Sequence, residues 1–440
     1  MIVIYSSIDR RRTNRRAKLS LCYPEESGRR AGIFHNLSFI VFNLRSSVRS
    51  VEDHHSLILF LFQIITNHLI FASMEIGSHY YAVLTLCRML GIKKDIAYRI
   101  AYSSEFVDDS LIERIVFKTP PRGVKCRIFG KKRGLDQCAT CLRIMTIWSY
   151  NQKKIINIFV PFHFIPGCRG SQFNKKMRTF PDSPILRSLT ERAINLGNPY
   201  SLGIIMHVLG DAHAHQGFSG LVSRRNRVRN LKIARESVRG FMDTLISWYM
   251  TRAEWLFSRI FGRILPLYSH SHVGTVPDIP SAEWSYKYDT GLSFLPEIKS
   301  SGLIKNRERY IIAFDEMREI LTRFLEKYPE NKETVPDVDI ELFNEQLTKV
   351  ISRRESIVDW EEFLVKYKLL DDTDTALHYD AHDWIRGAFK DYKRKKYSRS
   401  VVWNVLPVDG FSQTDWYKYY QAAREYKEHY DLLIFQHRVY

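Results

Sequence analysis

The sequence lacks the short motifs that identify several large enzyme classes. It has no G-x-G-x-x-G or G-x-x-x-x-G-K-S/T loop, which excludes the common glycine-rich cradles for dinucleotides and nucleotide phosphates. It also has no G-x-S-x-G turn and no internal repeat, which excludes the nucleophile elbow of α/β-hydrolases and a solenoid architecture. Alternating β-branched residues are scarce, so the apolar pattern favours helices over half-buried strands.

Cysteine and long apolar runs are also sparse. Six cysteines in 440 residues do not make a disulfide scaffold. Cys138 and Cys141 form a C-x-x-C pair flanked by Cys126 and Cys168, so a structural zinc site or a redox pair stays open beside the main interpretation, which is free thiols. The apolar run 57–72 contains polar residues and spans only 16 positions, whereas a membrane-spanning helix needs about 20. No transmembrane segment is therefore predicted.

Residues 1–73 differ in composition from the rest of the chain, with an arginine cluster at 10–16 and a serine-rich mixed stretch. Met74 opens a segment that looks like the start of a protein. We interpret Met74 as the translation start and residues 1–73 as sequence upstream of it. The alternative is that residues 1–73 form a poorly packed N-terminal anchor. We expect a helical domain over 74–300 and a helical C-terminal part, 301–440, packed on it. Because no export signal follows Met74, a cytoplasmic location is expected.

Acidic residues are in the minority. The 66 Lys and Arg outnumber the 48 Asp and Glu, which gives a formal charge of +18. Such an excess suits an anionic partner such as nucleic acid, phospholipid headgroups or a phosphorylated substrate. Part of it lies in two dense runs, 10–16 and 392–399, and such runs are more often solvated surface or tails than dedicated nucleic-acid sites.

The apolar periodicity predicts a mostly α fold, with one multi-helix domain and a helical C-terminal part. The segment 118–134 is rich in Pro, Gly and Lys and is predicted as a loop, while 154–164 is predicted as a strand or extended segment. Helices are predicted over 79–90, 93–102, 135–150, 186–196, 200–218, 228–261, 310–328, 339–353, 360–369, 380–395 and 414–433.

One predicted helix carries an unusual set of polar residues. His207, Asp211 and His215 recur at i, i+4 and i+8, so in a helix they stack along one face. Two imidazoles and a carboxylate are donors that a divalent transition metal prefers. The residues between them are apolar, and buried ionisable groups are costly unless they are paired or bound to metal. The alternative is a helix with three satisfied polar residues.

Seven further residues are candidate ligands, and each has an ordinary explanation when taken alone. A histidine at a helix start is usually a cap or surface residue, and two aspartates after Ser-Ser usually form a turn or N-cap. A histidine among apolar residues is usually a hydrogen-bonded core residue, and loop histidines are usually exposed. Their joint presence around the helical motif favours a metal centre. These candidates are His79, Asp108, Asp109, His163, His270, His272 and Asp278.

The motifs follow one another in a specific order. They are His79-Tyr-Tyr, Ser-Ser-Glu-Phe-Val-Asp108-Asp109, Pro-Phe-His163-Phe-Ile-Pro-Gly, His207-x3-Asp211-x-His-x-His215-Gln-Gly-Phe-Ser-Gly and Ser-His270-Ser-His272-Val-Gly-Thr-Val-Pro-Asp278. As a set they resemble an uncharacterised prokaryotic family, a domain of unknown function of the 6765 type. The resemblance covers Met74 to the C-terminus and leaves out residues 1–73.

More distantly, the order of ligands is similar to that of the zinc-dependent phospholipase C and single-strand nuclease superfamily. These are all-α enzymes that hydrolyse phosphodiesters with three zinc ions. The resemblance implies a phospholipase C/nuclease-like helical domain in which Asp211 is the bridging carboxylate. The implied ligands are His79, Asp108 or Asp109, His163, His207, Asp211, His215 and His270.

Three departures from the superfamily put the third ion in question. No processed N-terminal ligand is evident, and the gap from Asp211 to His215 is shorter than in those enzymes. The expected late Glu is absent, and His272 stands near its place, so His272 joins the candidate metal ligands.

These features predict a zinc-dependent hydrolase of phosphoester bonds, with two or three ions and an anionic or phosphate-bearing substrate, of which nucleic acid is one class. Asp108 or Asp109 is a candidate general base. His and Asp also suit manganese, iron or nickel. Two alternatives stay open. One is a metal-binding helical protein without turnover, and the other is a helical interaction module that uses its basic face and the aromatic helix around Trp416.

Overall fold

The computed structural model describes residues 76–142, 151–226, 228–238, 270, 273–288 and 302–439. These residues belong to one of the two units into which the chain divides, Ile65–Tyr440. The division predicted at residues 73 and 300 stays a prediction. No helix in the described ranges has the length and apolarity needed to cross a membrane, and the apolar run 57–72 lies outside those ranges.

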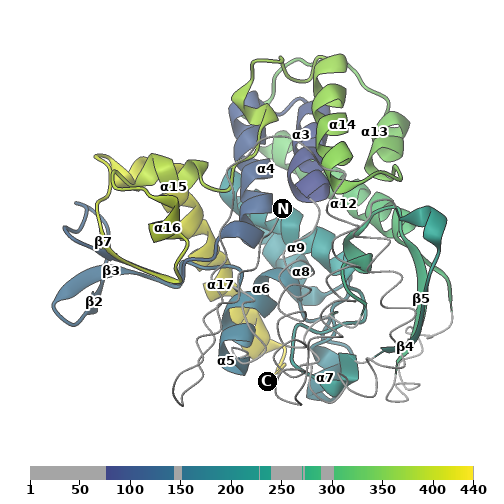
Figure 1. Cartoon of the computed structure of the whole chain (residues 1–440), viewed down its shortest axis with the longest axis horizontal. Coiled ribbons are helices and arrows are strands. Elements are labelled where there is room, and N and C mark those ends of the chain that lie inside the picture. Colours follow the sequence, from purple (N-terminus) through teal and green to yellow (C-terminus); the bar gives the residue numbers. More distant parts are fainter. Residues whose placement is uncertain are drawn as a thin grey trace, which may run out of the picture. The chain divides into compact units, whose positions relative to one another are not determined.

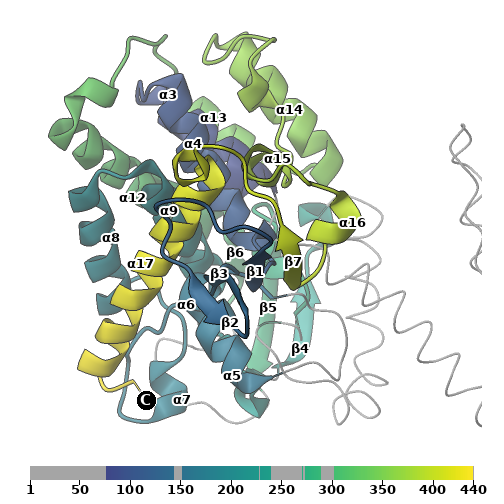
Figure 2. The same cartoon turned by 90° about the vertical axis from the view of Figure 1, so that its left-hand side faces the viewer.

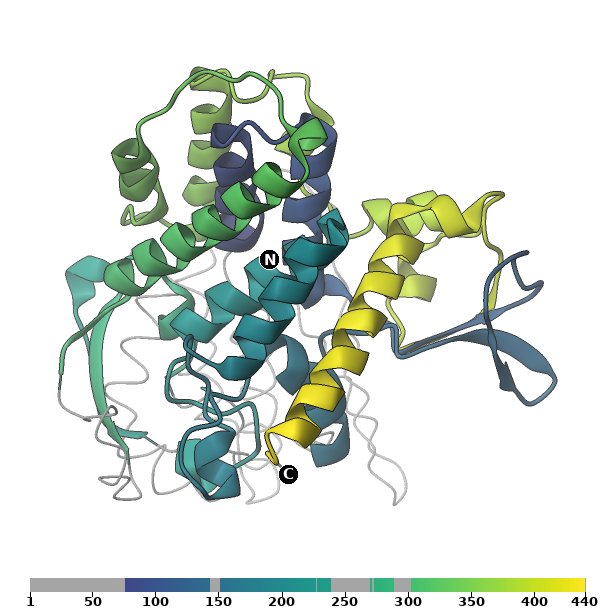
Figure 3. The same ribbon diagram turned by 180° about the vertical axis from the view of Figure 1, so that it is seen from behind.

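A buried helix, α9 (Pro199–Ala214), is the element around which several other helices pack. The Asn198 side chain caps its start by accepting a hydrogen bond from the Tyr200 amide, and Pro199 occupies its first turn. Its sequence is apolar on most sides, as expected for a helix surrounded by protein. The helices that contact α9 most extensively are α4 (Lys94–Asp109), α6 (Val160–His163), α8 (Pro184–Leu196), α12 (Asn306–Lys327) and α17 (Asp415–Gln436). Figure 3 shows α8, α12 and α17 from behind.

Two π-helical segments run into short α-helices near two of the candidate ligands. η1 (Gly77–Ala82) contains His79 and continues into α3 (Val83–Met89), while η2 (Ile155–Phe159) continues into α6, which ends at His163. π-helical turns are rare and are frequently found at functional sites. The remaining helices of Figure 1 are α5 (Gln152–Lys154), α7 (Phe173–Lys176), α13 (Ile340–Leu347), α14 (Arg353–Lys366), α15 (Asp383–Ala388) and α16 (Arg394–Tyr397).

The prediction of a mostly α, phospholipase C/nuclease-like helical fold is wrong. The described residues contain two β-sheets beside the helices, so the architecture is mixed α/β. The first sheet consists of β1 (Arg114–Phe117), β2 (Arg127–Phe129), β3 (Lys132–Asp136) and β7 (Val401–Val405). Its order is β2-β3-β1-β7, with β7 parallel to β1 and the other pairs antiparallel. Figure 2 shows β7 beside β1, with α16 next to it.

The second sheet is antiparallel and consists of β4 (Val228–Ile233), β5 (Glu283–Tyr288) and β6 (Ile304–Lys305). We predicted β4 as part of a helix. A bulge interrupts its pairing with β5, and Asn230 at the bulge has φ 52°. Val228 and Leu231 are three positions apart in sequence, and both are buried because the bulge lies between them. Buried residues at this spacing are typical of a helix, so the strand was mistaken for one.

Two other segments also differ from expectation. Residues 154–163 are helical, and the Asn151 side chain caps this helical segment by accepting hydrogen bonds from two backbone amides. A short apolar run cannot be assigned to strand or helix from periodicity alone. The predicted loop 118–134 contains the β2–β3 hairpin, whose strands expose charged residues and therefore show no apolar alternation. By contrast, the helices predicted over 186–196 and 414–433 are observed as α8 and α17.

Tyrosines connect the C-terminal third of the chain to η1 and α4. The Tyr80 hydroxyl donates to the Ala376 carbonyl at 2.6 Å, and the Tyr102 hydroxyl donates to the Asp380 carbonyl at 2.7 Å. Tyr102 also stacks on Trp384, with ring centroids 4.0 Å apart. These contacts fix the two elements that carry His79 and Asp108.

Candidate metal centre

The polar residues of α9 lie in the protein interior, where small residues let other elements approach them. His207 and Asp211 are at most 1% exposed. A Cβ at Gly203 would lie 2.2 Å from the Ile100 carbonyl oxygen of α4, so only glycine permits this approach of the two helices. A Cβ at Gly210 would come within 3.3 Å of the His79 ring. Glycine therefore brings α4 and η1 close to α9.

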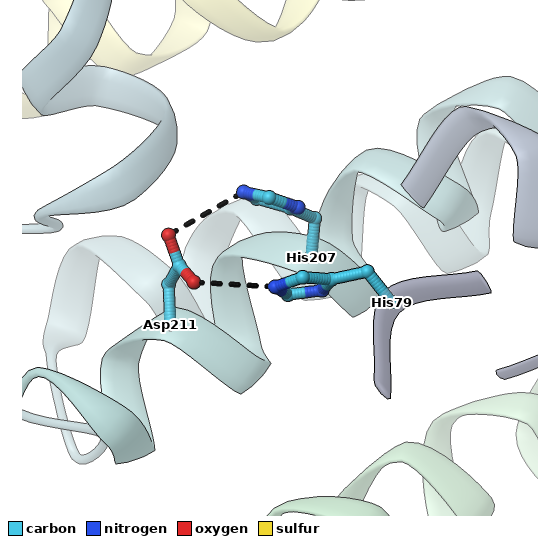
Figure 4. Close-up of side chains that lie close together, drawn as sticks. All are labelled: His79, His207 and Asp211. Carbon is cyan, nitrogen blue, oxygen red and sulfur yellow. Dashed lines mark ion pairs between the residues drawn. The ribbon is translucent and has the colours of Figure 1, made fainter. Parts of the chain in front are cut away.

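Three histidines surround Asp211. In Figure 4, His79 and His207 lie side by side and turn a nitrogen toward the two oxygens of Asp211, with each N–O distance 3.4 Å. Their rings are stacked, with centroids 4.1 Å apart. His163 approaches from α6, and its Nδ1 lies 3.1 Å from both Asp211 Oδ2 and His207 Nε2. We call these four residues, together with Asp108, the Asp211 cluster.

More polar atoms lie around His163 Nδ1 than this nitrogen can engage in hydrogen bonds. A ring nitrogen offers one hydrogen or one lone pair, yet Asp108 Oδ1 lies at 3.7 Å in addition to the two neighbours at 3.1 Å. Donors bound tetrahedrally to one zinc ion at about 2.0–2.1 Å are roughly 3.3 Å apart. Asp108 Oδ2 is buried and has no hydrogen-bond partner among the described residues. The Asp211 cluster therefore fits a bound cation.

A second group of donors adjoins the first. His215 donates from Nδ1–H to the His163 carbonyl at 3.1 Å, which leaves Nε2 facing Asp278 Oδ1 at 2.9 Å. His270 donates from Nδ1–H to the Gly274 carbonyl at 2.8 Å, and its Nε2 lies 3.8 Å from Asp278 Oδ2. A carbonyl that fixes Nδ1–H and frees Nε2 is the usual arrangement around metal-binding histidines. We call His215, His270 and Asp278 the Asp278 group.

The donors form three sets that could each hold a metal ion. In each set, one ligand atom per residue lies within 4.8 Å of the others. The sets are His79, His207 and Asp211; Asp108, His163 and His207; and His215, His270 and Asp278. His207 belongs to two of them, and His215 Nδ1 lies 3.8 Å from Asp211 Oδ2, so the three sets are contiguous.

Burial and neighbouring charges shift the pKa values of the site residues in different directions, so these residues differ in protonation state. Burial lowers the pKa of His207 to about 3, so its ring is neutral. Burial opposes the charged form of His215 too, but Asp211 and Asp278 outweigh it and raise the pKa to about 9. The pKa of Asp211 is held well below its usual value, because His215 and His207 outweigh the effect of burial.

The pKa of Asp108 is shifted in the opposite direction to that of Asp211. Burial, and next the negative charges of Glu105 and Asp211, raise its pKa well above the ordinary value. A carboxyl that is crowded by other carboxylates is stabilised in its charged form by a cation. The acidic side of the Asp211 cluster thus has the charge balance of a cation site.

The structure brings most of the candidate residues together. Asp109 lies elsewhere, since it accepts a hydrogen bond from the Tyr379 hydroxyl at 2.7 Å and belongs to none of the three sets. His272 lies outside the described residues. Asp278 was a candidate outside the ligand set that the phospholipase C/nuclease resemblance implies, and it completes the Asp278 group. The candidates found in the three sets are His79, Asp108, His163, His207, Asp211, His215, His270 and Asp278.

Sequence reasoning missed Glu105. This residue is 2% exposed and lies one turn before Asp108 on α4, where its charge contributes to the raised pKa of Asp108. The signal was a Glu-x-x-Asp spacing on a largely buried helix. Cys138 and Cys141 are free thiols, and the metal sets found in the described residues contain no cysteine.

Comparison with known proteins adds a family and nothing more specific. No curated protein matches the chain, and no solved structure matches it. One family model matches residues 74–431, which is most of the chain and includes every residue of the three metal sets. The chain therefore belongs to a family of unknown function, DUF6765.

Proposed function

We propose that this chain is a metal-dependent hydrolase that holds zinc at the Asp211 cluster and the Asp278 group and acts on phosphoester bonds. The observation that carries the proposal is the contiguity of the three donor sets, linked by His207 and His215. Adjacent ions are typical of enzymes that stabilise both the attacking and the leaving oxygen when a phosphoryl group is displaced. The order of ligands along the chain, similar to that of zinc-dependent phospholipases C and single-strand nucleases, favours a phosphodiester.

The residues present have distinct parts in this chemistry. His79, His207 and Asp211 would hold one ion, and the Asp278 group another. When bound, zinc supplies Lewis acidity that lowers the pKa of water from about 15.7 to about 7. Asp108 is the group that can hold a proton, because its pKa is raised by burial and by Glu105.

A second candidate is a metal site that serves only to hold the fold together. The burial of His79, His207 and Asp211, each at most 1% exposed, favours it, because a buried closed site leaves no coordination position for substrate. Asp108 and His270 have the more exposed side chains, at 10% and 16%, so any approach of substrate is expected on their side.

Metal content decides between these candidates and a protein without metal. We expect at least two zinc equivalents per chain by elemental mass spectrometry of the full-length protein, and fewer in Asp211→Ala. His213→Gln is the matched control, because His213 is equally buried on α9 but faces Glu316 at 3.3 Å. One equivalent with no turnover supports the structural role. No metal in any variant contradicts both candidates.

Turnover is then tested with bis(p-nitrophenyl) phosphate, an unspecific phosphodiester. Asp108→Asn should keep the ions held by His79, His207 and Asp211 and by the Asp278 group, to which Asp108 supplies no ligand. It should lose about 10²–10⁴-fold in rate, the usual contribution of a general base. Unchanged turnover in Asp108→Asn contradicts the role proposed for this carboxyl, and absence of turnover in the metal-loaded wild type contradicts the hydrolase.

A further inference from the structure

The first sheet unites two strongly basic segments of the described chain. Residues 114–133 contain eight Lys and Arg and no Asp or Glu, and residues 390–405 contain six against one. The parallel pairing of β1 with β7 places these segments side by side, although they are far apart in sequence. We call them together the basic lobe. Figure 1 shows its elements β2, β3, β7 and α16 grouped at the left.

Asn404 is where the two segments meet. Its side-chain oxygen accepts a hydrogen bond from Lys132 of β3, and its carbonyl accepts one from Lys396 of α16 at 3.1 Å. The two basic runs therefore form one continuous surface. Their charges are mostly solvated, since most of the lysines and arginines of the lobe are exposed.

The register of the sheet shows which side chains share its outer face. Trp403, Val116, Gly134 and Arg127 are directly opposite one another across the four strands, and opposed residues point to the same side. Trp403 is 48% exposed, although tryptophan usually contributes to a core. A large aromatic ring is thus left facing solvent among cations.

Further cations and one further ring lie on the same face. Lys132 Nζ lies 6.0 Å from the Trp403 ring centroid, and the Arg114 guanidinium lies 4.4 Å from that of Phe129. Asp136 is the acidic residue of this face, and it contacts Arg114 and Arg127 at 3.2 and 3.4 Å. A cavity beside β2 is lined by Arg127 and Asp136, and also by the cations Lys125 and Arg424.

We propose that the basic lobe binds a single-stranded nucleic acid. Exposed aromatic rings stack on bases irrespective of sequence, and surrounding lysines and arginines track the phosphates. The charge complementarity and the exposed Trp403 together favour a strand with accessible bases over a polyanion without them. The proposal concerns binding, and it stands whether or not the metal centre turns over.

The test is fluorescence anisotropy of the full-length protein with labelled dT20 and U20 between 50 and 200 mM salt. The triple variant Lys125→Gln, Arg127→Gln, Lys132→Gln removes three exposed cations of the lobe, and the register places Arg127 and Lys132 on the face that carries Trp403. We expect at least a tenfold loss of affinity and a salt slope smaller by about 2, from about 0.7 per phosphate contact on a single strand. The matched control is Arg307→Gln, Lys327→Gln, Lys366→Gln, which removes three exposed cations from helices outside the basic lobe, α12 and α14. It should change affinity less than threefold.

Trp403→Ala separates stacking from charge. We expect about a tenfold loss of affinity for the oligonucleotides, with binding of inorganic polyphosphate, which has no bases, unchanged. Circular dichroism checks that each variant is folded. Equal losses in the two triple variants overturn the proposal, because affinity then follows net charge alone. Binding to phosphatidylserine vesicles without binding to either oligonucleotide overturns it too, in favour of a lipid surface.

Discussion

The imidazole of His79 stacks on that of His207, with ring centroids 4.1 Å apart, and the two rings face opposite oxygens of one carboxylate. One of these histidines comes from η1 and the other from α9, so a bound ion would link the start of the described chain to its central helix. Each partner can be removed separately.

We expect His79→Gln to weaken metal binding at the Asp211 cluster by at least about 100-fold, because one of three donors is lost and no other donor of its set replaces it. Changes in residues that only support ligands typically cost about 10–100-fold. His213→Gln should leave affinity within threefold. The measurement is competition with a chromogenic zinc chelator. Equal affinity in wild type and His79→Gln would show that His79 is not a ligand.

Metal binding should release protons in an uneven way. His215 has a pKa raised to about 9, so it is protonated at pH 7 and must lose that proton before Nε2 can bind metal. His207, with a pKa of about 3, is already neutral. Affinity of the Asp278 group should therefore rise about tenfold per pH unit up to about pH 9 and fall as pH is lowered.

Calorimetric titration with zinc in two buffers of different ionisation enthalpy measures this release. We expect about one proton for the Asp278 group, lost in His215→Gln, and none from His207. Heats that are identical in the two buffers would contradict the protonation states assigned here.

Removal of metal should destabilise the fold. A ligand present at about 100 times its dissociation constant stabilises the native state by about 2.7 kcal/mol. Treatment with EDTA should therefore lower the melting temperature by several degrees, and zinc should restore it. Asp211→Asn is the control, since its melting temperature should respond less to EDTA, through the ion of the Asp278 group alone. A wild type that is insensitive to EDTA would argue against resident metal.

The approach of α4 to α9 depends on a missing side chain. Gly203→Ala places a Cβ 2.2 Å from the Ile100 carbonyl, so the helices must separate, at a cost of about 1–3 kcal/mol. Gly387→Ala is the matched control, because a Cβ there meets nothing within 4 Å, and replacing a helical glycine stabilises by about 0.5–1 kcal/mol. Urea unfolding midpoints measure both. Metal affinity should fall in Gly203→Ala alone, since α4 carries Asp108.

The spacing of His207, Asp211 and His215 was sufficient to predict a helix with a metal-like face, because three-dimensional proximity there follows directly from helical periodicity. Asp278 could be named but not assigned, since its contact with His215 depends on the fold of a loop. The choice between Asp108 and Asp109 also needed the structure, since adjacent residues of a helix point in different directions. The sheets were missed because a bulge at Asn230 and exposed charges on β2 and β3 remove the alternation that reveals strands.

The position of β1 between β3 and β7 has a consequence for synthesis on the ribosome. β1 ends at Phe117, whereas its partner β7 begins only at Val401. At about 5–20 residues per second, translation takes tens of seconds to cover that interval. During this time one edge of β1 has no native strand to pair with, and it lies in a strongly cationic stretch of the nascent chain. Repulsion between those like charges opposes edge-to-edge aggregation until the last strand emerges.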